Sequence, residues 1–275
     1  MYGLGCASST IWSVKRSLHD SCEINLCPSA STRDSLRQQG FREEKIRVWS
    51  RGVDCSTFNP AKKDDKLRSR WLEGSRRNST ESFDEGISMR LPTSDRVVLL
   101  YVGRLAWEKN LRVLVEAYRG LDHAACHLVI VGDGPARPSL EDALRGFPVT
   151  FTGYRTGEDL ASCYASADVF VFPSVSETFG QVVTEAHASG LPVVAINSDG
   201  PKDIILPGLS GILVDRNDED QVPTYREAIE RLILDPTLRQ KMSKKARERA
   251  ADFTWEGAME HCIHAYQEVY TRMLI

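Results

Sequence analysis

Short apolar runs alternate with amphipathic segments along most of the chain after residue 95. The apolar runs predict β-strands at 97–102, 127–131, 149–151, 169–172, 192–196 and 211–214. Between them, apolar positions recur at helical spacing and predict helices at 110–119, 139–145, 158–165 and 181–189. Nearly continuous apolar strands that alternate with helices are typical of a parallel sheet covered on both faces. The pattern therefore predicts an α/β fold with a Rossmann-like parallel sheet.

The two ends of the chain carry shorter patterns of the same kind. A strand, a helix and a strand are predicted at 23–27, 32–39 and 45–49, and three closing helices at 225–234, 236–251 and 255–272. Residues 61–95 differ, because they are charged, rich in Ser and Arg, and lack apolar periodicity. We expect this stretch to be a solvated linker or insertion that is partly disordered, with contact to an anionic surface as the alternative. Its arginines are Arg68, Arg70, Arg76 and Arg77.

Composition narrows the class of protein. Hydrophobic residues make up 41% of the chain and charged residues 27%, which suits a folded protein with a real core. The formal net charge of −3 offers no overall electrostatic reason to bind nucleic acid. No apolar run is long enough for a transmembrane helix, and residues 1–10 lack the pattern of a secretory leader. The seven cysteines have no C-x-x-C spacing, so we expect a reducing, cytoplasmic location and no cysteine metal site.

The loops that follow the predicted strands are where a parallel sheet places its ligands. After the first strand come Arg104 and Lys109, two cations next to a helix start, which suit a diphosphate; a solvated pair is the alternative. After the second come Gly132 and Gly134, which allow a backbone to approach a ligand closely; a simple tight turn is the alternative. After the third, the segment from Gly153 to Arg155 places an aromatic or backbone group where it can lie against a base, a weak signal.

The strongest local signal is the segment from Glu177 to Glu185, which opens a helix after the strand at 169–172. Gly180 permits close backbone approach, and the amides from Gly180 to Val183 are expected to be unpaired donors aimed at an anion. Eight helical residues span about 12 Å, so the two carboxylates can bracket a bound diphosphate and accept hydrogen bonds from diols. The alternative is that Glu177 is a helix-start charge and Glu185 a surface residue.

Together these loops resemble the donor domain of retaining glycosyltransferases with the GT-B fold, in the family that includes sucrose synthase and lipid mannosyl and sulfoquinovosyl transferases. The resemblance covers about residues 96–272. It rests on G-R-L-x-x-E-K at 103–109, G-D-G-P at 132–135, F-x-G at 151–153, S-A-D-V-F-V-F-P-S at 166–174, E-x7-E at 177–185, G-L-P-V-V-A at 190–195 and G-x-L-V at 211–214. Upstream, S-R-G-V-D at 50–54 resembles the end of the acceptor domain of that family.

The resemblance implies transfer of a hexose from a UDP- or GDP-sugar to a hydroxyl of a glycan or lipid, with retention. It implies that Arg104 and Lys109 neutralise the diphosphate, that Glu177 holds sugar hydroxyls and that Glu185 holds the ribose. The implied reaction needs no metal and no cofactor, since the nucleotide sugar is a substrate. The other implied donor-binding residues are Gly103, Gly132, Gly134, Gly153, Tyr154, Phe179, Gly180, Gln181, Val182 and Val183.

The chain departs from the family pattern in having few residues before the donor domain. We expect a remnant of the acceptor domain at 1–60, the charged linker at 61–95, the donor domain at 96–251 and a crossover helix at 252–275. The expected loss of the acceptor domain leaves a second hypothesis, a truncated, inactive nucleotide-sugar-binding module. The acceptor domain is also the part through which we would expect the protein to reach a cytosolic membrane surface. A dinucleotide-dependent oxidoreductase is excluded, because its glycine fingerprint is absent at 103–105.

Overall fold

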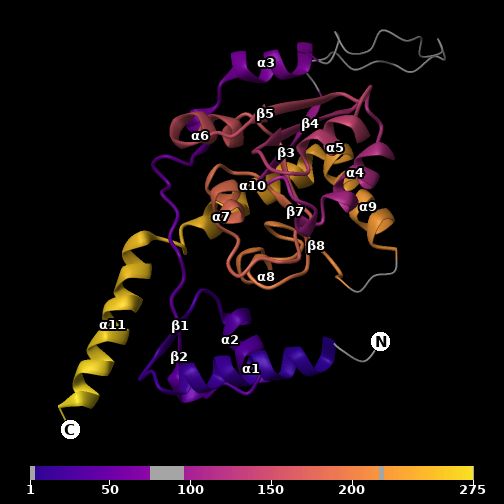
Figure 1. Ribbon diagram of the computed structural model, residues 1–275. Coiled ribbons are helices and arrows are strands. Elements are labelled where there is room, and N and C mark those ends of the chain that lie inside the picture. Colours follow the sequence, from indigo (N-terminus) through magenta and orange to yellow (C-terminus); the bar gives the residue numbers. More distant parts are fainter. Residues whose placement is uncertain (1–3, 75–95, 217–219, 275) are drawn as a thin grey trace. The chain divides into compact units, whose positions relative to one another are not determined.

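The structure, a computed structural model, describes residues 4–74, 96–216 and 220–274 and divides into two compact units (Figure 1). Unit 1 comprises Met1–Gly52 and Phe253–Ile275, and unit 2 comprises Val53–Asp252. The chain passes from unit 1 to unit 2 after Gly52, before the predicted domain boundary at residue 60. Residues after Gly52 pack within unit 2: the ring of Phe58 meets the ring of Tyr164 edge-on, with 5.7 Å between the ring centroids.

Unit 2 is built on a six-stranded, fully parallel sheet with strand order β5-β4-β3-β6-β7-β8. The six strands predicted from the apolar runs are therefore confirmed, with ends that differ by at most a few residues. Helices flank the sheet (Figure 1), as the alternating pattern required. The strands are β3 (Val97–Val102), β4 (Cys126–Val131), β5 (Val149–Gly153), β6 (Val169–Phe172), β7 (Val193–Ile196) and β8 (Gly211–Val214).

The connections between these strands are helical and place every strand's carboxyl end at one edge of the sheet. All six helices predicted for unit 2 are present, and α8 adds one short turn after β7. The elements are η5 (Trp107–Lys109), α4 (Leu111–Arg119), α5 (Arg137–Ala143), α6 (Gly157–Ala165), α7 (Gln181–Ala188), α8 (Pro201–Ile204), α9 (Gln221–Leu234) and α10 (Pro236–Ala250).

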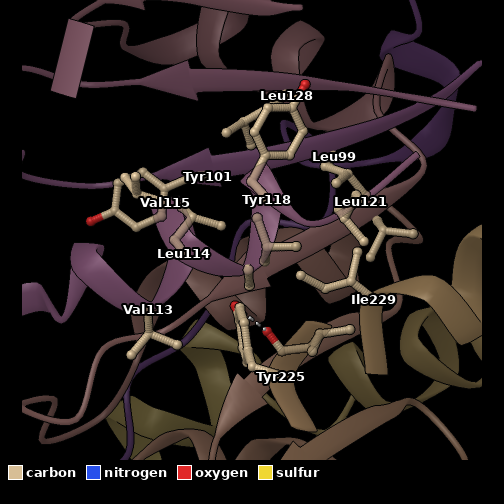
Figure 2. Packing of buried hydrophobic residues seen from close by; sticks show 14 of the residues in the cluster. Leu99, Tyr101, Val113, Leu114, Val115, Tyr118, Leu121, Leu128, Tyr225 and Ile229 are labelled. Carbon is tan, nitrogen blue, oxygen red and sulfur yellow. Dashed lines mark hydrogen bonds between the residues drawn. The ribbon is translucent and has the colours of Figure 1, made fainter. Parts of the chain in front are cut away.

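The main core of unit 2 lies between the sheet and the packed pair α4 and α9 (Figure 2). Leu114 and Tyr118 of α4 and Ile229 of α9 are fully buried there, because their helical spacing puts them on one face. Three tyrosines bring hydroxyls into this core, and each finds a carbonyl acceptor. Tyr101 donates to Arg104 at 3.2 Å, Tyr118 to Pro148 at 2.6 Å and Tyr225 to Val194 at 3.2 Å. Buried polar groups cost little when they are paired in this way.

The beginning of the predicted linker at 61–95 is ordered structure instead. A short turn, η2 (Pro60–Lys62), leads into α3 (Asp65–Gly74), whose Trp71 and Leu72 are buried. The prediction of a solvated arginine fails for Arg68, whose side chain is 15% exposed and forms an ion pair with Asp168 at 2.7 Å. Charge density hid this helix, because only Leu67, Trp71 and Leu72 of its ten residues have apolar side chains. Residues 75–95 lie outside the described parts of the chain.

Asp168 joins α3 to the start of the sheet, and we expect Asp168→Ala to lower the free energy of unfolding by about 3 kcal/mol. Its Oδ2 accepts the Arg68 guanidinium and the Val98 amide, both at 2.7 Å. Removing it leaves a buried amide without this acceptor and a largely buried cation without its counter-charge. Urea denaturation measures the change.

The matched control is Asp142→Ala, which removes an equally simple ion pair at the surface. Asp142 pairs with Arg145 at 2.7 Å, but both side chains are at least three-quarters exposed. Exposed pairs contribute roughly 0–1 kcal/mol, so this variant should unfold almost as the parent does. Equal losses for Asp168→Ala and Asp142→Ala would contradict the role given to Asp168.

Unit 1 combines the start and the end of the chain. Its two short parallel strands, β1 (Asn25–Cys27) and β2 (Ile46–Val48), pack with α1 (Leu4–Asp20), α2 (Ala30–Gln38) and η1 (Glu43–Lys45) around Cys27, Phe41 and Ile46. The closing helix α11 (Trp255–Met273) is attached by Arg47, which donates to both carboxylate oxygens of Glu268.

The helix α11 exposes an apolar stripe. Its exposed residues recur at spacings of three and four: Trp255, Met259, Ile263, Tyr266, Tyr270 and Met273. Neither α11 nor any other helix in the described ranges is long and apolar enough to cross a membrane.

Candidate functional site

The candidate site lies within unit 2, at the edge where the parallel strands end. The loops after β3, β4, β5, β6 and β7 leave this edge, and they hold every site residue predicted from the sequence apart from Gly153, which ends β5, and the residues on α7 itself. Because consecutive strands of the sheet end side by side, residues far apart in sequence can meet here. The contacts between the loops decide which of them do.

The first two loops are held together by backbone contacts, and this explains their glycines. The amide of Leu105 donates to Asp133 at 2.9 Å, and that of Ala136 to Leu105 at 2.8 Å. A Cβ on Gly132 would stand 2.0 Å from the Gly103 carbonyl oxygen, and one on Gly134 would stand 2.4 Å from that of Leu105. The close approach that these glycines permit is therefore between the two loops, whereas the sequence attributed it to a ligand.

Lys109 and Glu177 meet across the loops after β3 and β6. The Lys109 ammonium donates to Glu177 Oε1 at 2.5 Å, and the two side chains are only 22% and 24% exposed. Ser174 adds a longer contact to the same oxygen at 3.4 Å, and Ser176 donates to the carbonyl of Glu108 at 3.3 Å. Two residues predicted as separate parts of the site thus form a partly buried ion pair, with a cation and a carboxylate side by side.

Arg104 is not part of this pair. Its side chain is 67% exposed and, among the described residues, pairs with Glu108 at 3.8 Å along the same loop. Arg104 and Lys109 therefore do not share a partner in the structure, and the expectation that they flank a diphosphate together stays a prediction. A long, exposed arginine can still swing onto an anion, so its predicted role stays a prediction.

Asn110, which follows Lys109, explains how the lysine turns toward Glu177. Asn110 has φ of 57° and is the one residue other than glycine with a positive φ in the described ranges. It separates the tight turn η5 from α4, and its side-chain amide donates to Gln221 at 3.1 Å. Asparagine tolerates the left-handed conformation better than most residues, so the sequence K-N suits this sharp change of direction.

The helix α7 begins where the sequence predicted, directly after Gly180. Gly180 has φ of 91°, which favours glycine, and the following amides form the first turn. One of them is already used: Val183 donates to the Gly180 carbonyl at 2.8 Å, so it is not the unpaired donor that the sequence suggested. Val182 has no acceptor among the described residues and remains the candidate anion donor of this turn.

Phe179, just before this turn, is almost fully buried and packs its backbone against Gly200. A Cβ on Gly200 would lie 2.5 Å from the Phe179 carbonyl oxygen, so only glycine fits there. The loop after β7 therefore supports the start of α7. Sequence reasoning gave the segment around Gly200 no role, and no local pattern could have revealed one.

Glu185 lies on α7 and is partly buried, which excludes its interpretation as an ordinary surface residue. Its Oε2 accepts a hydrogen bond from the Tyr164 hydroxyl of α6 at 2.9 Å. Burial raises the pKa of Glu185 to about 7, and the bond from Tyr164 counteracts part of that rise. Carboxyl groups with such shifted pKa values are concentrated at functional sites.

The loop after β5 completes the edge. Gly153 has φ of 74°, and its carbonyl accepts the Gly132 amide at 2.9 Å, so it too belongs to the network of loops. The ring of Tyr154, beside it, is 77% exposed. An exposed aromatic ring at this edge is available for stacking, and its predicted contact with a base stays a prediction.

Comparisons with known proteins connect this geometry to a family. The family model described as "Glycosyl transferases group 1" matches residues 87–249, and that described as "Glycosyltransferase Family 4" matches residues 2–57. The chain is 35% identical to sulfoquinovosyl transferase SQD2 of Arabidopsis thaliana over 90% of this chain and 45% of that protein. It is 34% identical to a GDP-mannose-dependent alpha-mannosyltransferase of Corynebacterium glutamicum, over 98% of this chain and 58% of that protein.

Solved structures resemble the chain in fold. Sucrose-phosphate synthase from Thermosynechococcus elongatus matches with a TM-score of 0.77 and 25% identity, over 96% of this chain and 62% of that one. Anabaena HepE in complex with UDP-glucose matches with a TM-score of 0.74 and 21% identity, over 96% and 68%. The chain spans about half of the length of the first two curated relatives. It belongs to the glycosyl transferases group 1 family and has the GT-B glycosyltransferase fold.

Proposed function

We propose that unit 2 binds a nucleoside-diphospho-sugar and that the protein transfers its hexose, with retention, to a hydroxyl of a glycan or lipid acceptor on the cytosolic side of the cell. The observation that carries this proposal is the arrangement around α7. The Lys109–Glu177 pair precedes the helix, the Val182 amide lies in its first turn, and the Glu185 carboxylate lies one turn further on.

Each of these groups matches one part of such a donor. Carboxylates accept hydrogen bonds from neighbouring hydroxyls, so Glu177 suits the sugar and Glu185 the ribose. A lysine and a helix N-terminus suit the diphosphate between them. On this assignment, donor binding separates the Lys109–Glu177 pair, so that the ammonium takes a phosphate oxygen and the carboxylate takes sugar hydroxyls.

The chemistry follows from the charge that develops as the sugar leaves. The bond between the anomeric carbon and the phosphate oxygen breaks, its electron pair stays on the diphosphate, and the sugar becomes positive. Lys109, the amides at the start of α7 and an incoming Arg104 would stabilise the leaving diphosphate electrostatically. We propose that they do so without a divalent metal, so transfer should persist in excess chelator.

A donor panel tests the binding step directly. Relatives are named for GDP-mannose and a similar fold is known with UDP-glucose, so UDP and GDP are the nucleotides to compare, with ADP alongside them. We expect UDP or GDP to raise the melting temperature of the chain. If none of the three does so at millimolar concentration, the proposed function is wrong.

A second candidate is a module that binds the nucleotide sugar but transfers nothing. The chain spans 45% of one curated relative and 58% of another, so turnover by these 275 residues has to be measured separately from donor binding. The two candidates share every donor-binding residue and differ only in turnover. Release of free hexose or glycosylated acceptor from the matching sugar nucleotide would exclude the binding module.

Glu185→Gln should weaken binding of the preferred nucleoside diphosphate by about tenfold, because the ribose hydroxyls lose a charged acceptor that is worth roughly 1.5–3 kcal/mol. The loss should vanish for the 2′,3′-dideoxy nucleotide, which has no diol to present. Isothermal calorimetry with both ligands separates this effect from a general loss of affinity.

Glu248→Gln is the control for this change. Glu248 is an exposed carboxylate on α10 that pairs with Lys245 at 2.6 Å, away from the loops of the site. It should bind both ligands as the parent protein does. If Glu185→Gln discriminates between the ribose and dideoxy ligands as strongly as the parent does, Glu185 does not hold the ribose.

A further inference from the structure

The Glu185 carboxylate has one hydrogen-bond donor within the described residues, and that donor is a tyrosine. The Tyr164 hydroxyl donates to Oε2 at 2.9 Å, while Oε1 receives no such bond. Tyr164 comes from α6, a different helix, and is fully buried. One oxygen is therefore tied to the core, and the other is left for a ligand.

The aromatic surroundings of Tyr164 determine where its hydroxyl lies. Its ring meets Phe58 edge-on and Phe170 at a tilt, with 5.7 Å between ring centroids in each case. A ring held from two sides in a packed core has little freedom to turn. The hydroxyl is thus a fixed donor, which the carboxylate of Glu185 must approach in one direction.

The cations Arg247 on α10 and Lys202 on α8 have other partners and do not donate to Glu185 in place of the Tyr164 hydroxyl. On α10, Arg247 donates to the backbone carbonyls of Phe58 and Ala188, and on α8, Lys202 pairs with Asp199. Burial raises the pKa of Glu185, and the hydrogen bond from Tyr164 lowers it. Burial raises that pKa to about 7, so near neutral pH the ionised form depends on this hydroxyl.

We propose that Tyr164 is a positioning residue of the donor site, whose hydroxyl holds Oε2 of Glu185 so that Oε1 can accept the ribose diol. This inference rests on the proposed function, because it needs Glu185 to meet a ribose. It adds a residue that never touches the donor and acts through Glu185 alone. It also makes donor affinity depend on pH near neutrality, because binding strengthens as the carboxyl loses its proton.

Tyr164→Phe tests this in two measurements. In the free protein, carbon-13 NMR follows the titration of the Glu185 carboxyl, whose signal is identified by its absence in Glu185→Gln. Loss of the hydroxyl should raise the midpoint by about one pH unit, since it removes a hydrogen bond to a charged group. In the second measurement, the affinity for the preferred nucleoside diphosphate is recorded from pH 5.5 to pH 8.5. The variant should bind several-fold more weakly at pH 7 and recover above pH 8.

Tyr118→Phe is the matched control. It removes another fully buried tyrosine hydroxyl of unit 2, which donates to the Pro148 carbonyl at 2.6 Å and has no contact with Glu185. It should leave both the Glu185 titration and the pH profile of binding unchanged, and thermal unfolding checks that both variants are folded.

The two possible failures are distinguishable. Normal nucleotide binding by the parent protein, together with an unshifted Glu185 titration in Tyr164→Phe, would overturn the role of Tyr164 and leave the proposed function standing. Absence of nucleotide binding by the parent at every pH would overturn the proposed function and, with it, the ligand role inferred for the tyrosine.

Discussion

Lys109→Met is expected to weaken binding of the preferred nucleoside diphosphate by about 10-fold to 100-fold, the value of one hydrogen bond from a charged group. Transfer should fall further, by about 100-fold or more, because the charge that Lys109 meets grows as the sugar leaves. The loss should be absent for the plain nucleoside, which carries no phosphate. Calorimetry with nucleoside and nucleoside diphosphate measures the first effect, and release of the sugar measures the second.

Removing Lys109 also leaves Glu177 without its partner, so folding must be separated from binding. The ion pair is only partly exposed, and an unpaired carboxylate there costs stability. The double variant Lys109→Met/Glu177→Gln removes both charges and should recover stability, but it should not recover diphosphate affinity. Lys245→Met, at an exposed lysine on α10, controls for the loss of one positive charge. Equal loss for nucleoside and diphosphate would contradict a phosphate contact.

Gly132→Ala is expected to lower the free energy of unfolding by about 4 kcal/mol, from overpacking and backbone strain together. Its Cβ would stand 2.0 Å from the Gly103 carbonyl oxygen, a backbone atom that cannot move without its whole loop. Its φ of 134° is also one that residues with a side chain rarely adopt. The loops after β3 and β4 would separate, and Lys109 would move with the first. Urea denaturation and nucleotide affinity should both report the damage.

Gly146→Ala separates the two causes. Gly146 also has a positive φ, of 85°, but a Cβ there would meet nothing within 4 Å. Its substitution carries the backbone strain alone, which we place at about 1–2 kcal/mol. Losses of equal size at the two positions would show that the contact between the loops contributes nothing.

The parallel sheet was predictable because its signal is local. Six apolar runs, separated by helical patterns, marked all six strands of unit 2, and the glycine before α7 marked the start of that helix. Where the prediction failed, at α3, the decisive contacts were distant. The sequence predicts that Arg68 is a solvated charge, whereas in the structure it pairs at 2.7 Å with Asp168, which lies far along the chain.

The candidate site was predictable as a set of residues but not as a set of contacts. Glu177, Glu185 and Lys109 were named from the sequence, yet the Lys109–Glu177 pair and the Tyr164–Glu185 bond join loops and helices that only the sheet brings together. The glycines show the same limit. The sequence indicated a close backbone approach at Gly132, and the fold places the loop after β3 against it.

The sequence by itself determined the class of fold, the edge of the sheet where the candidate site lies and the identity of its charged residues. These depend on periodicity and on residue types near strand and helix ends, which act over a few positions of the chain. The tertiary structure alone decided which cation pairs with which carboxylate, that Glu185 is partly buried and that a tyrosine supports it. Those properties depend on distance and on exclusion of water, and both arise only when remote segments pack against one another.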